Sequence, residues 1–125
     1  MFKGLVKVVQ GILGNRDIGP VPITVSIKPN ISEGDIEQLR RELQSRGFRV
    51  GRYVHIEGTD FRIIECLAPK EVYEGLFSMK VTAYRPFNNR NYALEYKDLQ
   101  TPEIPLELRD IITSVSVAQK VYAAH

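Results

Sequence analysis

Cysteine, histidine and tryptophan are scarce in this sequence, whose 125 residues include one cysteine, two histidines and no tryptophan. Cys66 has no partner for an intramolecular disulfide, and no Cys-x-x-Cys pair is present for a metal or redox site. A reducing compartment therefore suits the composition better than an oxidising one.

Long apolar runs are also lacking. The longest one near the N-terminus, residues 5–13, is interrupted by Lys7, Gln10 and Gly11, whereas a membrane-spanning helix needs ~20 apolar residues. The segment Gly14–Asp17 that follows does not look like the small-residue cleavage site of a signal peptide. We therefore expect an uncleaved cytoplasmic protein, free or assembled into a particle made in the cytoplasm.

A strong net charge is the third absence. Lys and Arg total 17 against 15 Asp and Glu, which gives a net charge of +2. This charge is too small to bring the whole molecule onto a polyanion, so any nucleic-acid binding must be local. The apolar share of 43% is typical of a folded globular domain, and the length allows one hydrophobic core.

The first half of the domain begins with a strand and a helix. Apolar and polar residues alternate over 23–27, which predicts a half-buried strand. Ser32, followed three positions later by Asp35, resembles a helix N-cap, and Gly47 is a typical helix stop. We expect a helix over 33–45 that buries one narrow face.

A hairpin is predicted next, with Gly58 and Thr59 in the turn. This register pairs apolar residues with one another on one face and places an ion pair further along it. The pairs are Ile56 with Phe61, Val54 with Ile63, and Arg52 with Glu65. The sequence predicts that the face holding the two apolar pairs is buried.

The C-terminal half is expected to hold a second hairpin and a helix. Alternation begins at Phe77 and returns at Tyr92 beyond an asparagine-rich turn. Apolar residues at helical spacing from Leu108 to Tyr122 then predict a C-terminal helix. Together the elements predict an α+β domain at residues 23–125, a small antiparallel sheet of about five strands covered by helices.

Residues 1–16 predict a separate amphipathic helix, set apart by a Gly/Pro linker at residues 17–22. Its apolar stripe requires a cover, which its own sheet, a partner chain or lipid could supply. We interpret the stripe as a partner-binding surface formed by Phe2, Leu5, Val6, Val9, Ile12 and Leu13.

No group of residues has the spacing of a catalytic or metal site. In the predicted register His55 and Cys66 lie several residues apart along one face, too far for a thiol–imidazole pair. Glu57 and Asp60 flank a turn, where carboxylates are common without a catalytic role. We expect no enzyme activity, cofactor or metal.

Arginines gather in the middle of the chain, with the aromatic residues Phe48 and Tyr53 between them, a pattern that suits nucleic acid. The candidate phosphate-binding residues are Arg40, Arg41, Arg46, Arg49, Arg52 and Arg62. Seven carboxylates fall in the same window, residues 31–66. Ion-paired surfaces are therefore the preferred interpretation.

These observations favour a non-enzymatic structural module, a small subunit of a larger complex such as a virion. It would assemble with other protein chains as a homo- or hetero-oligomer through its N-terminal helix. One alternative is a nucleic-acid-binding domain that uses the arginines; another is a small enzyme whose site is shared with partners. Peripheral membrane contact by the N-terminal helix is less favoured.

Overall fold

The computed structural model describes residues 19–85, 91 and 94–118. The predicted N-terminal helix lies outside the described residues, as does the end of the predicted C-terminal helix. The elements, in chain order, are β1 (Val21–Ile27), α2 (Glu33–Ser45), β2 (Arg49–His55), β3 (Arg62–Ala68), α3 (Lys70–Phe77), β4 (Val81–Tyr84), β5 (Glu95–Asp98), the 3-10 helix η2 (Leu106–Leu108) and β6 (Ile112–Val117).

The predicted α+β class is observed, although the strands form two sheets in place of one. The larger sheet has four strands in the order β2-β3-β1-β6, and the smaller pairs β4 with β5. All neighbouring strands are antiparallel. Apart from the β4–β5 pair and η2, the connectivity is the β-α-β-β-α-β arrangement of ferredoxin-like units.

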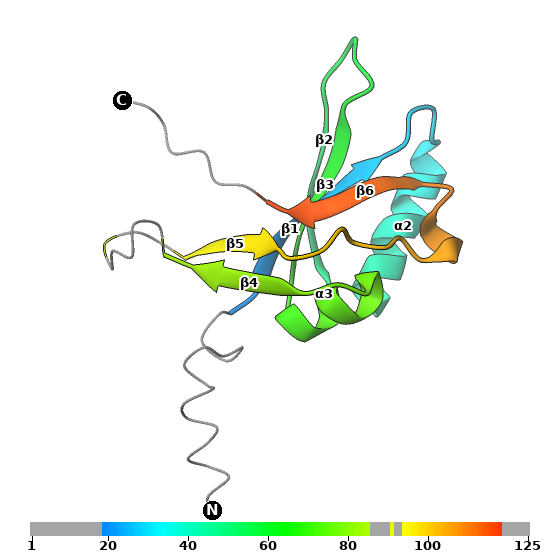
Figure 1. The fold of residues 1–125 in the computed structure, drawn as a ribbon. Coiled ribbons are helices and arrows are strands. Elements are labelled where there is room, and N and C mark those ends of the chain that lie inside the picture. Colours follow the sequence, from blue (N-terminus) through cyan, green and yellow to red (C-terminus); the bar gives the residue numbers. More distant parts are fainter. Residues whose placement is uncertain (1–18, 86–90, 92–93, 119–125) are drawn as a thin grey trace, which may run out of the picture.

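One face of the large sheet holds the core. Val25 of β1 lies opposite Ile64 of β3 and Val115 of β6, and all three are buried. Leu39 and Leu43 of α2 belong to the same cluster, and α2 and α3 lie together beside the sheet in Figure 1. Figure 1 also shows the β2–β3 hairpin extending away from this body.

Helix α2 has the bounds that the sequence predicts. The Ser32 hydroxyl accepts a hydrogen bond from the Asp35 amide at 3.1 Å, which satisfies one of the free N–H groups of the first turn. At the other end Gly47 has φ +101°, a conformation that suits glycine. The capping residues therefore set the length of the helix.

The β2–β3 register is the predicted one near the turn and shifts further along. Val54 pairs with Ile63, and the Ile56 amide donates to the Phe61 carbonyl at 3.2 Å. The pairing then shifts between Val50 and Tyr53 at an irregularity that contains Gly51. A Cβ at Gly51 would lie 3.0 Å from the Glu65 carbonyl oxygen, so the close approach of the two backbones requires glycine there.

The prediction of which hairpin face is buried was wrong. Ile56 and Phe61 are 51% and 48% exposed, whereas Ile64, on the opposite face, is fully buried. Strand β3 carries apolar residues on both faces, so alternation alone does not choose between them. Which face is buried depends on the position of β3 between β2 and β1, where Ile64 lies against the core.

The predicted C-terminal helix was also wrong for its described part. The chain forms η2 and then strand β6, which pairs with β1. Ile112 and Val115 are three residues apart and both buried, a spacing that resembles a helix. The spacing arises because the register shifts opposite Ser26 and Ile27, where the bulge adds one residue.

The second predicted hairpin is observed in part. β4 pairs with β5 as Val81 with Asp98 through Tyr84 with Glu95. The strand does not begin at Phe77, as predicted, because Phe77 is the last residue of α3 and Ser78 adopts a left-handed conformation with φ 47°.

The smaller sheet is tied to the rest of the domain by Asp98. This carboxylate accepts a 2.8 Å hydrogen bond from the Tyr73 hydroxyl of α3 and a 3.1 Å bond from the Val117 amide of β6. Tyr73 is fully buried and packs against Phe77. Asp98 thereby connects α3, β5 and β6.

Candidate functional site

The second face of the large sheet is the candidate site, and we call it the open face. Its residues alternate with the core residues along each strand, so that Thr24 of β1 and Glu65 of β3 lie opposite each other. Side chains on this face are half-buried or exposed, in contrast to their buried neighbours. The open face therefore has no layer of helix on it among the described residues.

The hairpin end of the open face is apolar. Two cross-strand pairs, Val54 with Ile63 and Ile56 with Phe61, follow one another toward the turn on this face. Val54 and Ile63 are half-buried, and the outer pair is about half exposed. We call these residues the hairpin patch. Acidic Glu57 and Asp60 lie beside it in the exposed turn.

An ion pair occupies the middle of the open face. The Arg52 guanidinium donates two hydrogen bonds to the Glu65 carboxylate, each 3.2 Å long. These bonds raise the pKa of Arg52. Both side chains are substantially exposed, so the pair contributes little to stability and leaves polar atoms available to a partner.

A shallow hollow lies at the end of the open face opposite the hairpin turn. It has a volume of about 380 Å³ and a mostly apolar lining. On the open face its lining runs from Thr24, Gly51 and Glu65 near the middle of the face to Arg49, Pro22, Leu67 and Ala118 at the end. The open face thus carries an exposed apolar pair of side chains at one end and an apolar hollow toward the other.

The structure disperses the predicted arginine cluster. Arg46 binds Glu42 and Glu107 at 2.9 and 3.0 Å, and these hydrogen bonds raise its pKa. The remaining arginines lie on different parts of the domain. Arg40 donates to the Gly51 carbonyl, Arg62 donates to the Ile31 carbonyl, and Arg52 pairs with Glu65. Arg41 and Arg49 are exposed, and neither forms an ion pair with another described residue.

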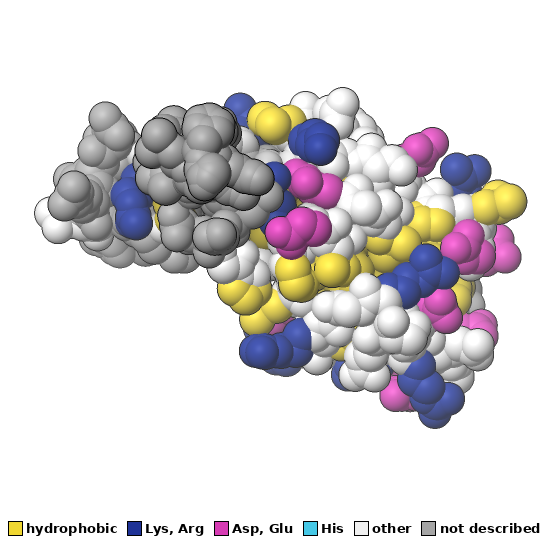
Figure 2. Space-filling model, turned by 90° about the horizontal axis from the view of Figure 1, so that it is seen from below, with side chains coloured by type: hydrophobic (Ala, Val, Ile, Leu, Met, Phe, Trp, Pro, Cys, Tyr) yellow, Lys and Arg dark blue, Asp and Glu magenta, His cyan; other side chains and the backbone are white. Residues whose placement is uncertain are grey.

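Within β1 and β3, the central strands of the described sheet, the open face also lacks the aromatic side chains expected of an RNA-binding sheet. Open sheets that bind single-stranded RNA stack bases on aromatic side chains, whereas β1 presents Pro22 and Thr24 on the open face and β3 presents Glu65. In Figure 2, basic and acidic side chains of the described residues are interspersed on the face shown. Neither observation favours nucleic acid.

Replacing Arg46, Arg49 and Arg52 together with alanine is expected to leave nucleic-acid affinity unchanged, because two of the three charges are already held by carboxylates. Electrophoretic mobility of labelled RNA and DNA at low salt would measure this. A salt-dependent shift with the parent that the triple variant lacks would contradict the expectation.

Cys66 is placed as a core residue. Its side chain is 5% exposed on the helix-covered face, and burial raises the pKa of the thiol to about 11, with a smaller opposing effect from Arg40. His55 is exposed near the hairpin turn, where its ring lies 3.3 Å from the Thr59 carbonyl oxygen. The two residues do not form a nucleophile–base pair.

We therefore expect Cys66 to react slowly with thiol reagents in the folded protein. At pH 8 a pKa near 11 in place of 9 lowers the thiolate fraction about a hundredfold, and burial hinders access further. Colour release from an aromatic disulfide reagent, with and without urea, would measure the ratio. Equal rates in the two conditions would show that Cys66 is not buried.

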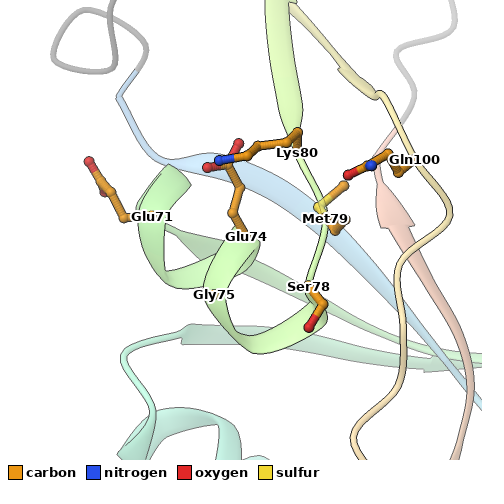
Figure 3. Close-up of a pocket in the computed structure, with 7 residues that line it drawn as sticks. All are labelled: Glu71, Glu74, Gly75, Ser78, Met79, Lys80 and Gln100. Carbon is orange, nitrogen blue, oxygen red and sulfur yellow. The ribbon is translucent and has the colours of Figure 1, made fainter.

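Another hollow, between α3 and the segment after β5, has a volume of about 400 Å³. Figure 3 shows Glu71 and Glu74 on α3 and Gln100 across from them. The Glu74 carboxylate accepts from the Val81 amide at 2.8 Å and from the Lys70 ammonium at 3.0 Å. Glu74 thus joins α3 to β4, a structural role that accounts for its position.

Within the described ranges no group of His, Cys, Asp or Glu residues is arranged to hold a metal ion. The helices of this part of the chain are too short or too polar to cross a membrane. The predicted partner-binding residues Phe2, Leu5, Val6, Val9, Ile12 and Leu13 lie outside the described residues. Comparisons with protein-family models, with curated proteins and with solved structures gave no match.

Proposed function

We propose that this chain is a non-enzymatic assembly module, a small subunit of a larger protein complex, which binds partner protein through the open face of its sheet. The observation that carries the proposal is the exposed hairpin patch. Ile56 and Phe61 keep about half of their surface accessible beside Val54 and Ile63, although the core face of the same sheet is buried. A contiguous apolar patch of this kind, rimmed by charges, is typical of a protein–protein interface.

The composition of the face favours protein over the other ligand classes. An exposed aromatic residue is a typical anchor of a protein interface, and Phe61 is the aromatic member of the hairpin patch, in its outer pair. The Arg52–Glu65 pair offers both signs of charge, which suits a mixed protein surface better than a polyanion. The hollow beyond it is open and shallow, and it suits an inserted side chain.

The apolar stripe of the N-terminal segment remains part of the proposal as a second contact. Residues 1–18 lead into β1, whose Pro22 lines the hollow. Ala118, where the described chain ends, donates to the Pro22 carbonyl at 2.9 Å. Both ends of the domain therefore lie next to the open face, so a partner there is within reach of both.

The test is the mass of the complex that contains this chain when it is isolated from the cells that make it. Phe61→Asp places a charge in the hairpin patch and is expected to release the chain at its monomer mass of 14.2 kDa. Tyr84→Asp is the matched control, because Tyr84 is an aromatic residue with the same 48% exposure on β4.

Light scattering after size exclusion would measure both variants. The proposal is supported if the parent and the Tyr84 variant are each found in a heavier species and the Phe61 variant is not. A parent that is monomeric in its own cells, or a complex that keeps the Phe61 variant, contradicts it.

A further inference from the structure

We propose that the partner on the open face is a second copy of this chain, bound face to face about a two-fold axis that crosses the strands. This inference rests on the proposed function and names the partner. In such an arrangement the hairpin end of each copy lies over the hollow of the other, and each contact occurs twice. Sheets that pack face to face lie ~10 Å apart, a distance that side chains fill.

The two ends of the open face are complementary to each other. Phe61 and Ile56 form an exposed apolar pair at one end, and the apolar hollow extends to the other, where Leu67 and Pro22 line it. Phe61 and Leu67 lie on the same face of the chain, about 20 Å apart at the rise of a strand. A two-fold axis midway between them places the Ile56–Phe61 pair of each copy over the hollow of the other.

The two ends of the open face also carry opposite charges. The turn next to the hairpin patch carries Glu57 and Asp60, and the hollow carries Arg49. All three are exposed, and no ion pair is formed by them among the described residues. The same two-fold axis that places Phe61 over the hollow brings the acidic turn of one copy to Arg49 of the other, so shape and charge agree on one arrangement.

The centre of the open face carries both signs of charge. The Arg52–Glu65 pair lies near the axis, so the two copies present two arginines and two carboxylates to one another there. Each arginine can bind the carboxylate of either copy, which avoids a like-charge contact. A face that carried only one sign of charge at its centre would repel a second copy.

The small size of the face favours a weak association. Four strands are about 19 Å wide at the usual strand spacing, and the distance from Asp60 to Arg49 is about 24 Å. A footprint of this size is at the small end of specific interfaces. We expect a reversible dimer with a dissociation constant in the micromolar range, and this range sets the concentrations for the test.

The test is sedimentation equilibrium of the purified full chain from about 1 to 300 μM, together with a charge exchange. Arg49→Glu and Asp60→Arg are each expected to weaken the dimer about tenfold or more, since each reversal creates two like-charge contacts. The double variant carries both changes, which restores opposite charges across the interface. It is expected to dimerise within about threefold of the parent.

Urea unfolding of each variant is the control, and unchanged stability is expected because both positions are exposed. A parent that remains monomeric throughout the range, or a double variant that stays as weak as the single variants, overturns this arrangement. If the dimer is absent but the complex from native cells still depends on Phe61, the proposed function stands and only the face-to-face dimer is wrong. If the complex does not depend on Phe61, the proposed function is wrong too.

Discussion

Ile64→Asp is expected to abolish folding, whereas Ile63→Asp is expected to give a folded protein. The two residues are adjacent in β3 and chemically identical, but Ile64 is fully buried against the helices and Ile63 is half-buried on the open face. An unpaired carboxylate in the core costs several kcal/mol, a large part of the stability of a domain of this size. At a half-exposed position the cost is about 1 kcal/mol.

Circular dichroism and urea unfolding of the two variants would measure this difference. Ile64→Val is the control for a small change at the buried position, and it should cost about 1 kcal/mol. A folded Ile64→Asp variant with a stability close to that of the parent would contradict the assignment of the two faces. So would an unfolded Ile63→Asp variant, because that result would mean that the open face is covered within one chain.

Asp98→Ala is expected to produce the second large loss of stability, about 2–4 kcal/mol. The substitution removes the acceptor for two buried donors, the Tyr73 hydroxyl and the Val117 amide. Tyr73→Phe removes only one donor and should cost about 1–2 kcal/mol. The double variant should lose less stability than the two single variants lose together. Asp98→Ala alone leaves the Tyr73 hydroxyl buried without an acceptor, and Tyr73→Phe removes that hydroxyl.

Urea unfolding of the four proteins in this cycle would give the coupling free energy between Tyr73 and Asp98. We expect a coupling of about 1 kcal/mol or more in favour of the pair. Strict additivity, or an Asp98→Ala variant as stable as the parent, would contradict the role of Asp98 as the connection between α3, β5 and β6.

Tyr73 also predicts how stability depends on alkaline pH. Burial, followed by the hydrogen bond to Asp98, raises the pKa of its phenol above the usual value. The folded state therefore favours the protonated phenol, and this stabilisation is fully present below the unfolded pKa of about 10 and is lost as pH rises above it. Tyr73→Phe should show a shallower loss of stability above pH 10 than the parent.

The sequence was sufficient to predict the local signals of this fold. Ser32 and Gly47 mark the ends of α2 as expected, and the register of the β2–β3 hairpin near its turn follows from the pairing of Val54 with Ile63. Those features depend on residues close together in the chain. Capping and turn chemistry are local, and no knowledge of the rest of the molecule is needed to predict them.

The errors concern features that depend on distant parts of the chain. The buried face of β3 is chosen by its neighbour β1, and the apolar residues that β3 carries on both of its faces conceal that choice. The bulge near Ser26 gives β6 the apolar spacing of a helix. One signal could have identified the open face: Arg52 and Glu65 share it with the apolar hairpin pairs, and an ion pair is costly to bury.

The candidate site was therefore missed for the same reason as the fold details. The sequence interpretation placed Ile56 and Phe61 in the core, so their surface was not considered for a partner. The arginines, in contrast, were considered as a cluster because they are close in sequence, but the structure places Arg46 at the C-cap of α2 and Arg52 on the open face. Proximity along the chain was a poor guide in both cases.

Photo-crosslinking from position 61 tests the central claim, that the open face binds protein, most directly. A benzophenone side chain in place of Phe61 preserves an aromatic group there, and the same group in place of Tyr84 is the control of equal 48% exposure. On irradiation in the native cells, we expect position 61 to form a covalent adduct with one defined protein species and position 84 to form none. Adducts at both positions alike, adducts only with nucleic acid, or no protein adduct at position 61 would contradict the claim.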